Sequence, residues 1–70
     1  MAEPRLGNNL KDARVKLGWT QAELAQRAGV SRKTINTVEN CVFIPSTLLA
    51  LVLARELGKP VEKLFFLVDG

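Results

Sequence analysis

The 70-residue chain contains no histidine and no tyrosine, and it has a single cysteine, Cys41. Without histidine or a second cysteine, it offers neither a Cys/His zinc cluster nor a His-based catalytic apparatus, and it cannot form an internal disulfide. We therefore expect a reduced, cytoplasmic setting. Because no nucleophile–base pair, metal-spaced carboxylate dyad or phosphate-cradling glycine loop is recognisable, we predict neither an enzyme nor a cofactor or metal site.

Long hydrophobic runs are also absent. The longest, residues 48 to 54, is far shorter than the roughly 20 residues that a membrane-spanning helix needs. No charged segment leads into an apolar signal segment, so we expect no membrane partner. The length predicts one small domain over residues 1–70, which would bury only about 60% of its unfolded surface and be marginally stable alone.

The charged residues are unevenly distributed along the chain. The net charge is +3, and residues 38–70 contain slightly more acidic than basic side chains. A basic segment of this kind is expected to attract a polyanion such as nucleic acid. In residues 11–37 the acidic side chains are Asp12 and Glu23, and the basic ones are Lys11, Arg14, Lys16, Arg27, Arg32 and Lys33.

Residues 20–39, TQAELAQRAGVSRKTINTVE, predict two short amphipathic helices joined by a tight turn. Thr20 and Glu23 have the spacing of a capping box at the start of the first helix. Gly29 suits the left-handed residue that often follows a helix, and Ser31 is a favourable N-cap for the second. Such a pair of helices is suited to placing the second one in a DNA groove.

The second of these helices has two unlike faces. Ile35, Val38 and Val42 share one side, and the opposite side has hydrogen-bonding side chains. Arg32 and Lys33 lie in the first turn, where the helix dipole disfavours cations by about 0.3–1 kcal/mol. A phosphate or a guanine edge would supply the missing partner. The alternative is an ordinary solvated helix face.

The remaining segments also predict helices. Pro45 and Ser46 introduce a helix that Gly58 ends, and Pro60 begins a last one. Upstream, Asn8 or Asn9 caps a packing helix that Gly18 closes, and its apolar stripe consists of Leu6, Leu10, Ala13 and Leu17.

From Asn8 to about Leu67, the chain resembles the Cro and phage-repressor type of helix-turn-helix DNA-binding domain. TQAELAQRAGVSRKTINTVEN matches the tripartite motif, PSTLLALVLARELG resembles the following helix, and PVEKLF resembles the last one. The resemblance implies an all-α fold, a compact five-helix bundle of the lambda-repressor type. It also implies a sequence-specific transcriptional regulator, most simply a small repressor, that binds double-stranded DNA through its recognition helix.

The resemblance also implies roles for individual residues. Arg14 in the first helix would pair with Glu39 at the end of the recognition helix and hold the two together. Gln21 would anchor a backbone phosphate, and the loop from Asn40 through Phe43 would grip phosphate through its backbone N–H groups. The predicted DNA-binding side chains are Gln21, Arg32, Lys33, Thr34, Asn36, Thr37 and Asn40.

Two residues depart from the family pattern. The family usually has glycine where Cys41 stands, and a left-handed conformation costs another residue about 1 kcal/mol. Either Asn40 adopts that conformation or the loop bends differently. Cys41 is either a small hydrophobe or a redox sensor near DNA. Trp19 replaces a smaller apolar residue and is either a lid on the core or a ligand-stacking side chain.

The C-terminal half predicts an interface. The helix after Ser46 is hydrophobic on nearly every side, and a helix of that kind needs cover on more than one face. We expect Leu49, Leu53 and Leu57 to face the core. A homodimer would cover the rest, with a short extended C-terminal segment pairing with its twin. The alternatives are that these residues close the monomer core, or that they meet a toxin or other protein, as in an antitoxin or adaptor. The predicted interface residues are Leu48, Val52, Phe66, Leu67 and Val68.

Overall fold

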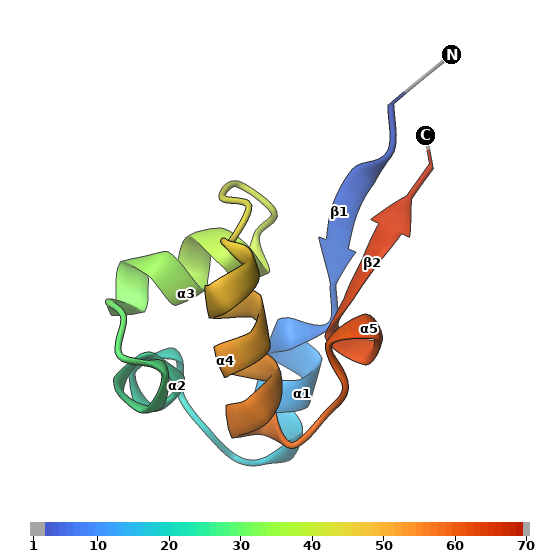
Figure 1. Ribbon diagram of the computed structural model, residues 1–70. Helices are drawn as coiled ribbons and strands as arrows, with labels where there is room; N and C mark the ends of the chain where they lie inside the picture. Colours follow the sequence, from blue (N-terminus) through green and yellow to red (C-terminus); the bar gives the residue numbers. More distant parts are fainter. Residues whose placement is uncertain (1–2, 70) are drawn as a thin grey trace.

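The computed structural model describes residues 3–69, and within them the chain forms five helices and a two-stranded antiparallel sheet (Figure 1). The helices surround the core, and the sheet joins the two ends of the chain. The elements are β1 (Arg5–Asn8), α1 (Leu10–Lys16), α2 (Gln21–Ala28), α3 (Arg32–Glu39), α4 (Thr47–Leu57), α5 (Val61–Leu64) and β2 (Phe65–Val68).

The helix ends lie where local sequence rules place them. The Glu23 N–H donates to Thr20 Oγ1 at 3.0 Å, and the Thr20 N–H donates to Glu23 Oε1 at 3.3 Å, which completes the predicted capping box. Gly29 ends α2 with a left-handed φ of 73°. Ser31 Oγ accepts the Thr34 N–H at 3.1 Å and caps α3. The predicted helix-turn-helix is therefore confirmed.

Each helix contributes one side chain with no exposed surface to the core: Leu10, Leu24, Ile35, Leu53 and Leu64. Trp19 packs against this core, as expected of a lid. The Arg27 guanidinium lies 4.1 Å from the centre of its ring, a cation–π contact.

Three apolar positions of the predicted stripes lie outside the core. Leu6 lies in β1 and not in the first helix, because α1 begins only at Leu10. Val42 is 76% exposed because α3 ends at Glu39, three residues before it. Leu17 is 48% exposed because it caps the end of α1 rather than continuing its buried face.

The all-α prediction is wrong in one respect, because β1 and β2 pair into a ribbon. The extended C-terminal segment exists, but it pairs with the N-terminal segment of its own chain, with Gly7 opposite Phe66. A Cβ at Gly7 would lie 2.5 Å from Phe66 Cε1 and 2.8 Å from Val68 Cγ2. Glycine therefore lets these two side chains cover β1.

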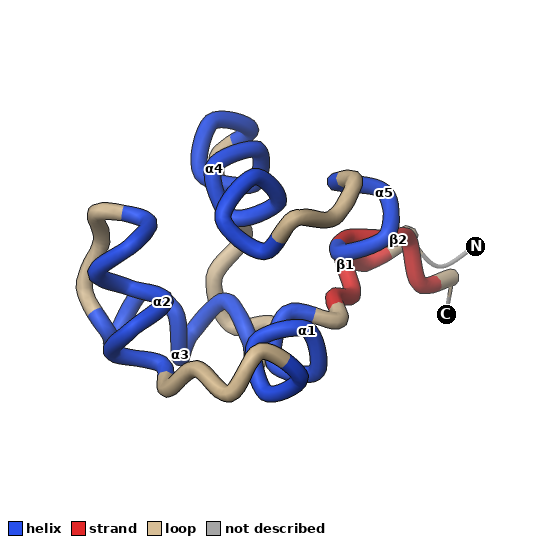
Figure 2. Tube along the Cα trace, turned by 90° about the horizontal axis from the view of Figure 1, so that it is seen from below, coloured by secondary structure: helices blue, strands red, loops and turns tan. Residues whose placement is uncertain are grey.

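The ribbon projects from the helices at the end of the molecule opposite α2, as both views show (Figures 1 and 2). The α3–α4 loop and the outer end of the ribbon extend toward the same side in Figure 1. None of the helices in residues 3–69 is both long and apolar enough to cross a membrane.

Candidate nucleic-acid interface

Helix α3 presents a polar face to the outside because its apolar face is anchored in the core. Ile35 and Val38 are buried, and four of the predicted contact residues on the other face are exposed. In the described residues, the side chains of these four form no hydrogen bond or ion pair with another protein group. They are Arg32, Lys33, Asn36 and Asn40.

The two threonines of α3 are engaged locally and are only partly exposed. Thr34 Oγ1 lies 3.0 Å from Ser31 Oγ. Thr37 Oγ1 donates to the Lys33 or Thr34 carbonyl oxygen, each at 3.0 Å. A hydroxyl has one proton to donate. Thr37 must therefore leave these carbonyls before it can donate to DNA, whereas the four exposed side chains are already available.

A buried polar cluster fixes the recognition helix against α1 and α2. Glu39 Oε2 accepts from Arg14 Nε at 2.7 Å, and Glu39 Oε1 accepts from Arg14 Nη2 at 3.1 Å and from Gln21 Nε2 at 3.0 Å. Arg14 Nη1 also donates to the Trp19 carbonyl oxygen at 2.8 Å. The side chains of Arg14 and Glu39 are 9% and 3% exposed. The structure thus brings together the pair that the family resemblance implied, and adds Gln21 to it.

The contact with Glu39 constrains how Gln21 can bind phosphate. Its Nε2 group has two protons, and one of them is directed at Glu39. The second proton is the donor left for a phosphate, so the same amide can brace the recognition helix and contact DNA. Gln21 is half-buried at the first position of α2, which is consistent with both roles.

The loop after α3 departs from both expectations for Cys41. Cys41 itself adopts the left-handed conformation, with φ of 61°, whereas Asn40 has φ of −88°. The loop N–H groups are used within the chain: Asn40 donates to Asn36, Cys41 to Val38, and both Val42 and Phe43 donate to the Thr37 carbonyl. In this structure, the Asn40 side chain rather than these N–H groups is available to phosphate.

Three of the six cations in residues 11–37 already have partners. Arg14 pairs with Glu39, Lys16 pairs with Asp12 at 3.2 Å, and Arg27 stacks on Trp19. The Arg27 side chain keeps its full charge, because tryptophan is neutral, so Lys11, Arg27, Arg32 and Lys33 remain as cations without an acidic partner in the described residues.

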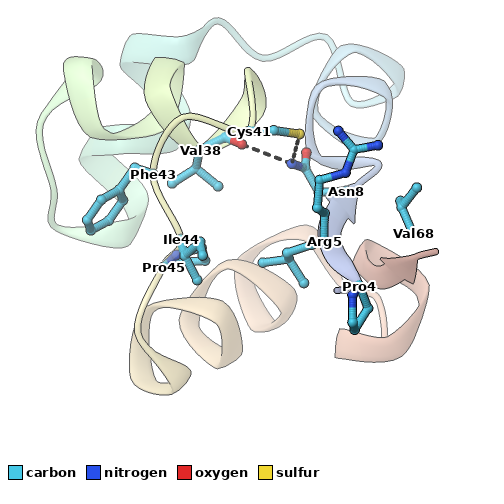
Figure 3. Close-up of a pocket in the computed structure, with 10 residues that line it drawn as sticks. Pro4, Arg5, Asn8, Val38, Cys41, Phe43, Ile44, Pro45 and Val68 are labelled. Carbon is cyan, nitrogen blue, oxygen red and sulfur yellow. Dashed lines mark hydrogen bonds between the residues drawn. The ribbon is translucent and has the colours of Figure 1, made fainter. Parts of the chain in front are cut away.

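A pocket of about 460 Å³ separates β1 from the α3–α4 loop (Figure 3). Arg5 and Asn8 line it from β1, and Cys41 and Phe43 line it from the loop. Sequence reasoning gave Arg5 no role, because nothing local to residue 5 shows that the fold brings it near residue 41.

The predicted interface residues lie on two elements. On α4, Leu48 is 73% exposed and Val52 is partly buried. On β2, Leu67 is 70% exposed, Phe66 is 40% exposed and Val68 is partly buried. Leu51, which was not predicted to be exposed, is 51% exposed on α4.

Two helices joined at a left-handed glycine, with a free polar face on the second, define a helix-turn-helix DNA-binding domain. The chain belongs to the helix-turn-helix family, whose model matches residues 10–64.

Comparisons with known proteins agree with this assignment. The chain is 44% identical to an HTH-type transcriptional regulator from Methanothermobacter thermautotrophicus, over 83% of this chain and 86% of that protein. The crystal structure of the hypothetical transcription factor NHTF from Neisseria is similar, with a TM-score of 0.75 and 29% identity over 79% of this chain and 62% of that one. Antitoxin HipB of Escherichia coli is 44% identical over 51% of this chain and 41% of its own length.

Proposed function

We propose that the protein is a sequence-specific transcriptional regulator, a small dimeric repressor that reads a palindromic operator with α3 in the major groove. Arg32, Lys33 and Asn36 would contact base edges or phosphates, and Gln21 and Asn40 would contact the backbone. Thr34 and Thr37 would lie at the protein–DNA boundary, chiefly as hydrogen-bond acceptors and through their methyl groups. Binding of such a dimer would occlude a promoter.

The observation that carries this proposal is the unpaired cationic start of α3. Arg32 and Lys33 lie in the first turn of a helix that has no acidic residue there, and both are exposed. The helix dipole opposes cations at this position. By contrast, the buried cluster around Glu39 holds α3 rigidly in place. An anionic DNA groove would supply the negative charge that the first turn of this fixed helix lacks.

The ribbon offers a geometry for the dimer. In the described residues, β2 pairs with β1 along one edge only, and Leu67 is largely exposed. A two-stranded ribbon is marginal by itself, and a free strand edge is a template for another strand. Pairing β2 with its twin about a two-fold axis would give a four-stranded sheet and two recognition helices. Such helices generally bind half-sites roughly 34 Å apart on one face of DNA.

The test is an in vitro selection of duplexes from a random DNA pool at about 150 mM salt, where non-specific attraction is already weakened. We expect a two-fold symmetric motif, whose half-site spacing would then define the dimer geometry. No enrichment by folded protein would contradict sequence-specific binding. Enrichment of a single asymmetric half-site would contradict the dimer while leaving the reading role of α3 in place.

An antitoxin or adaptor is the second candidate, and the similarity to HipB favours it. In that case the exposed apolar residues of α4 and β2 would bind a different protein rather than a twin. Analytical ultracentrifugation separates the two proposals. A dimer at micromolar concentration favours the repressor. A monomer, whose apolar residues on α4 and β2 would remain uncovered, favours the protein-binding module.

A further inference from the structure

Asn8 lies at the junction of β1 and α1, and both ends of its side-chain amide are used. Its Oδ1 accepts the Leu10 N–H at 3.1 Å, which supports the start of α1. Its Nδ2 donates to the Val38 carbonyl oxygen at 2.9 Å and lies 3.7 Å from Cys41 Sγ (Figure 3). One side chain therefore joins the start of the first helix to the end of the recognition helix.

The Val38 carbonyl belongs to the last turn of α3, where carbonyls lack helical partners. It accepts the Cys41 N–H at 3.1 Å as well as the Asn8 amide. These two donors fix the point at which the chain leaves α3 and Cys41 turns into the left-handed conformation. The orientation of Asn40 and the loop beyond it depends on that point.

The Val38 side chain itself is buried in the core, but little packing supports the loop that follows it. The pocket of about 460 Å³ lies beside it and separates β1 from Phe43, Ile44 and Pro45 of the loop. Ile44 is 72% exposed, so its side chain does not fasten the loop to the core. Because the pocket is open, apolar contacts cannot replace the hydrogen bonds if Asn8 loses its donor.

We propose that Asn8 is a positioning residue for DNA binding, which holds the exit from α3 and the Asn40–Phe43 loop in the geometry that meets the phosphate backbone. The inference rests on the proposed function, since it requires that α3 and this loop face DNA. Asn8 itself does not touch DNA in this account; it acts through Val38 and Cys41.

The substitution Asn8→Asp isolates the donor. A carboxylate still accepts the Leu10 N–H, and its charge suits a helix start, but it repels the Val38 carbonyl oxygen. Asn9→Asp is the matched control, because it adds the same charge one residue away and removes a donor that bonds Lys63 at 3.3 Å, on the side of α5. Asn8→Ala removes the donor without adding charge, and it also removes the Oδ1 acceptor of the Leu10 N–H.

We expect Asn8→Asp and Asn8→Ala to weaken binding to the selected duplex about tenfold, at a temperature where circular dichroism shows all variants folded. Asn9→Asp should change it less than twofold. Amide hydrogen exchange followed by NMR should accelerate at Cys41, Val42 and Phe43 in both Asn8 variants and remain unchanged in α2. A purely structural role would instead lower stability without this local signature.

The outcomes are distinguishable. Equal affinities for Asn8→Asp and Asn9→Asp would overturn the inference while leaving the proposed function intact. Unchanged amide hydrogen exchange in the loop of the Asn8 variants would also overturn it. So would loss of the dimer in the Asn8 variants but not in Asn9→Asp, measured by sedimentation. Failure of the unmodified chain to bind any selected duplex would overturn the proposed function and, with it, the role of Asn8. If Asn8→Asp is incompletely folded, the same comparison is made in a Cys41→Gly background. Glycine relieves the strain of the left-handed residue 41, and the Val38 carbonyl acceptor is retained.

Discussion

The segment from Thr20 to Glu39 and the ribbon of β1 and β2 differ in how far their polar and apolar groups find partners within the same chain. In the first, each helix start is capped within the chain, and the Glu39 carboxylate receives three hydrogen bonds. In the second, Leu67 is largely exposed, and β2 is paired along one edge in the described residues. The helix starts and the buried charges of the helix-turn-helix are thus satisfied within one chain, whereas the ribbon has an exposed apolar residue and a free edge. The two regions should respond differently to substitution and to protein concentration.

The largest effect is expected where the helix-turn-helix depends on its buried charges. Arg14→Ala leaves Glu39, 3% exposed, without its main partner, and breaking a buried pair costs about 3–5 kcal/mol. Chemical denaturation followed by circular dichroism measures this loss. Lys16→Ala is the control, since it breaks the exposed Lys16–Asp12 pair and should cost no more than about 1 kcal/mol.

If Arg14→Ala is largely unfolded, a paired substitution keeps the test informative. Replacing both Arg14 and Glu39 with leucine removes the stranded charge and should restore part of the stability. Equal unfolding free energies for the Arg14→Ala and Lys16→Ala variants would show that the cluster is not what holds α3.

The ribbon should respond to a change at its exposed face mainly through association. Leu67→Lys alters both copies in a two-fold interface, and losing about 1.5 kcal/mol of burial at each would raise the dimer Kd roughly a hundredfold. Sedimentation equilibrium over a range of concentrations measures it. Leu17→Lys makes the same substitution on a 48% exposed residue at the end of α1 and should leave the Kd unchanged. A dimer that tolerates Leu67→Lys would place the interface elsewhere.

The exposed face of α3 should affect DNA binding and not folding. Lys33→Ala and Arg32→Ala should each weaken specific binding by about 1–3 kcal/mol if they read bases, and should mainly reduce the salt dependence if they touch only phosphate. Titrations at several salt concentrations separate these cases. Lys59→Ala removes the same charge from the end of α4, away from α3, and serves as the control. Unchanged affinity in both α3 variants would move the DNA-binding surface elsewhere.

The same division explains how far the sequence could predict the structure. Thr20, Glu23 and Ser31 act on backbone groups three residues away or fewer, so the helix-turn-helix followed from local rules. The ribbon pairs four residues near one end of the chain with four near the other. Neither strand is long enough to show a pattern of its own, and no local rule names its partner. For that reason β1 was missed, and the pairing of β2 with it was not predicted.

The candidate site divides in the same way. The outward position of Arg32 and Lys33 follows from helical periodicity once Ile35 is buried. Two other contacts depend on the tertiary structure, which side-chain type alone does not specify. They are the hydrogen bond from Gln21 to Glu39 and the one from Asn8 to the Val38 carbonyl. The engagement of the loop N–H groups could not be predicted either, because it depends on the conformation of Cys41.

The smallest expected effect concerns the junction between the two regions, where Cys41 holds a conformation that Gly29 adopts without strain. Both residues are left-handed, with φ of 61° and 73°. Cys41→Gly should therefore be more stable than Cys41→Ala by about 1 kcal/mol, or about 4–8 °C in Tm for a domain of this size. Both variants lose the contact between Asn8 Nδ2 and the thiol, so the difference between them isolates the backbone term. Thermal unfolding of both variants measures it. Equal Tm values would mean that the loop relaxes out of the left-handed conformation.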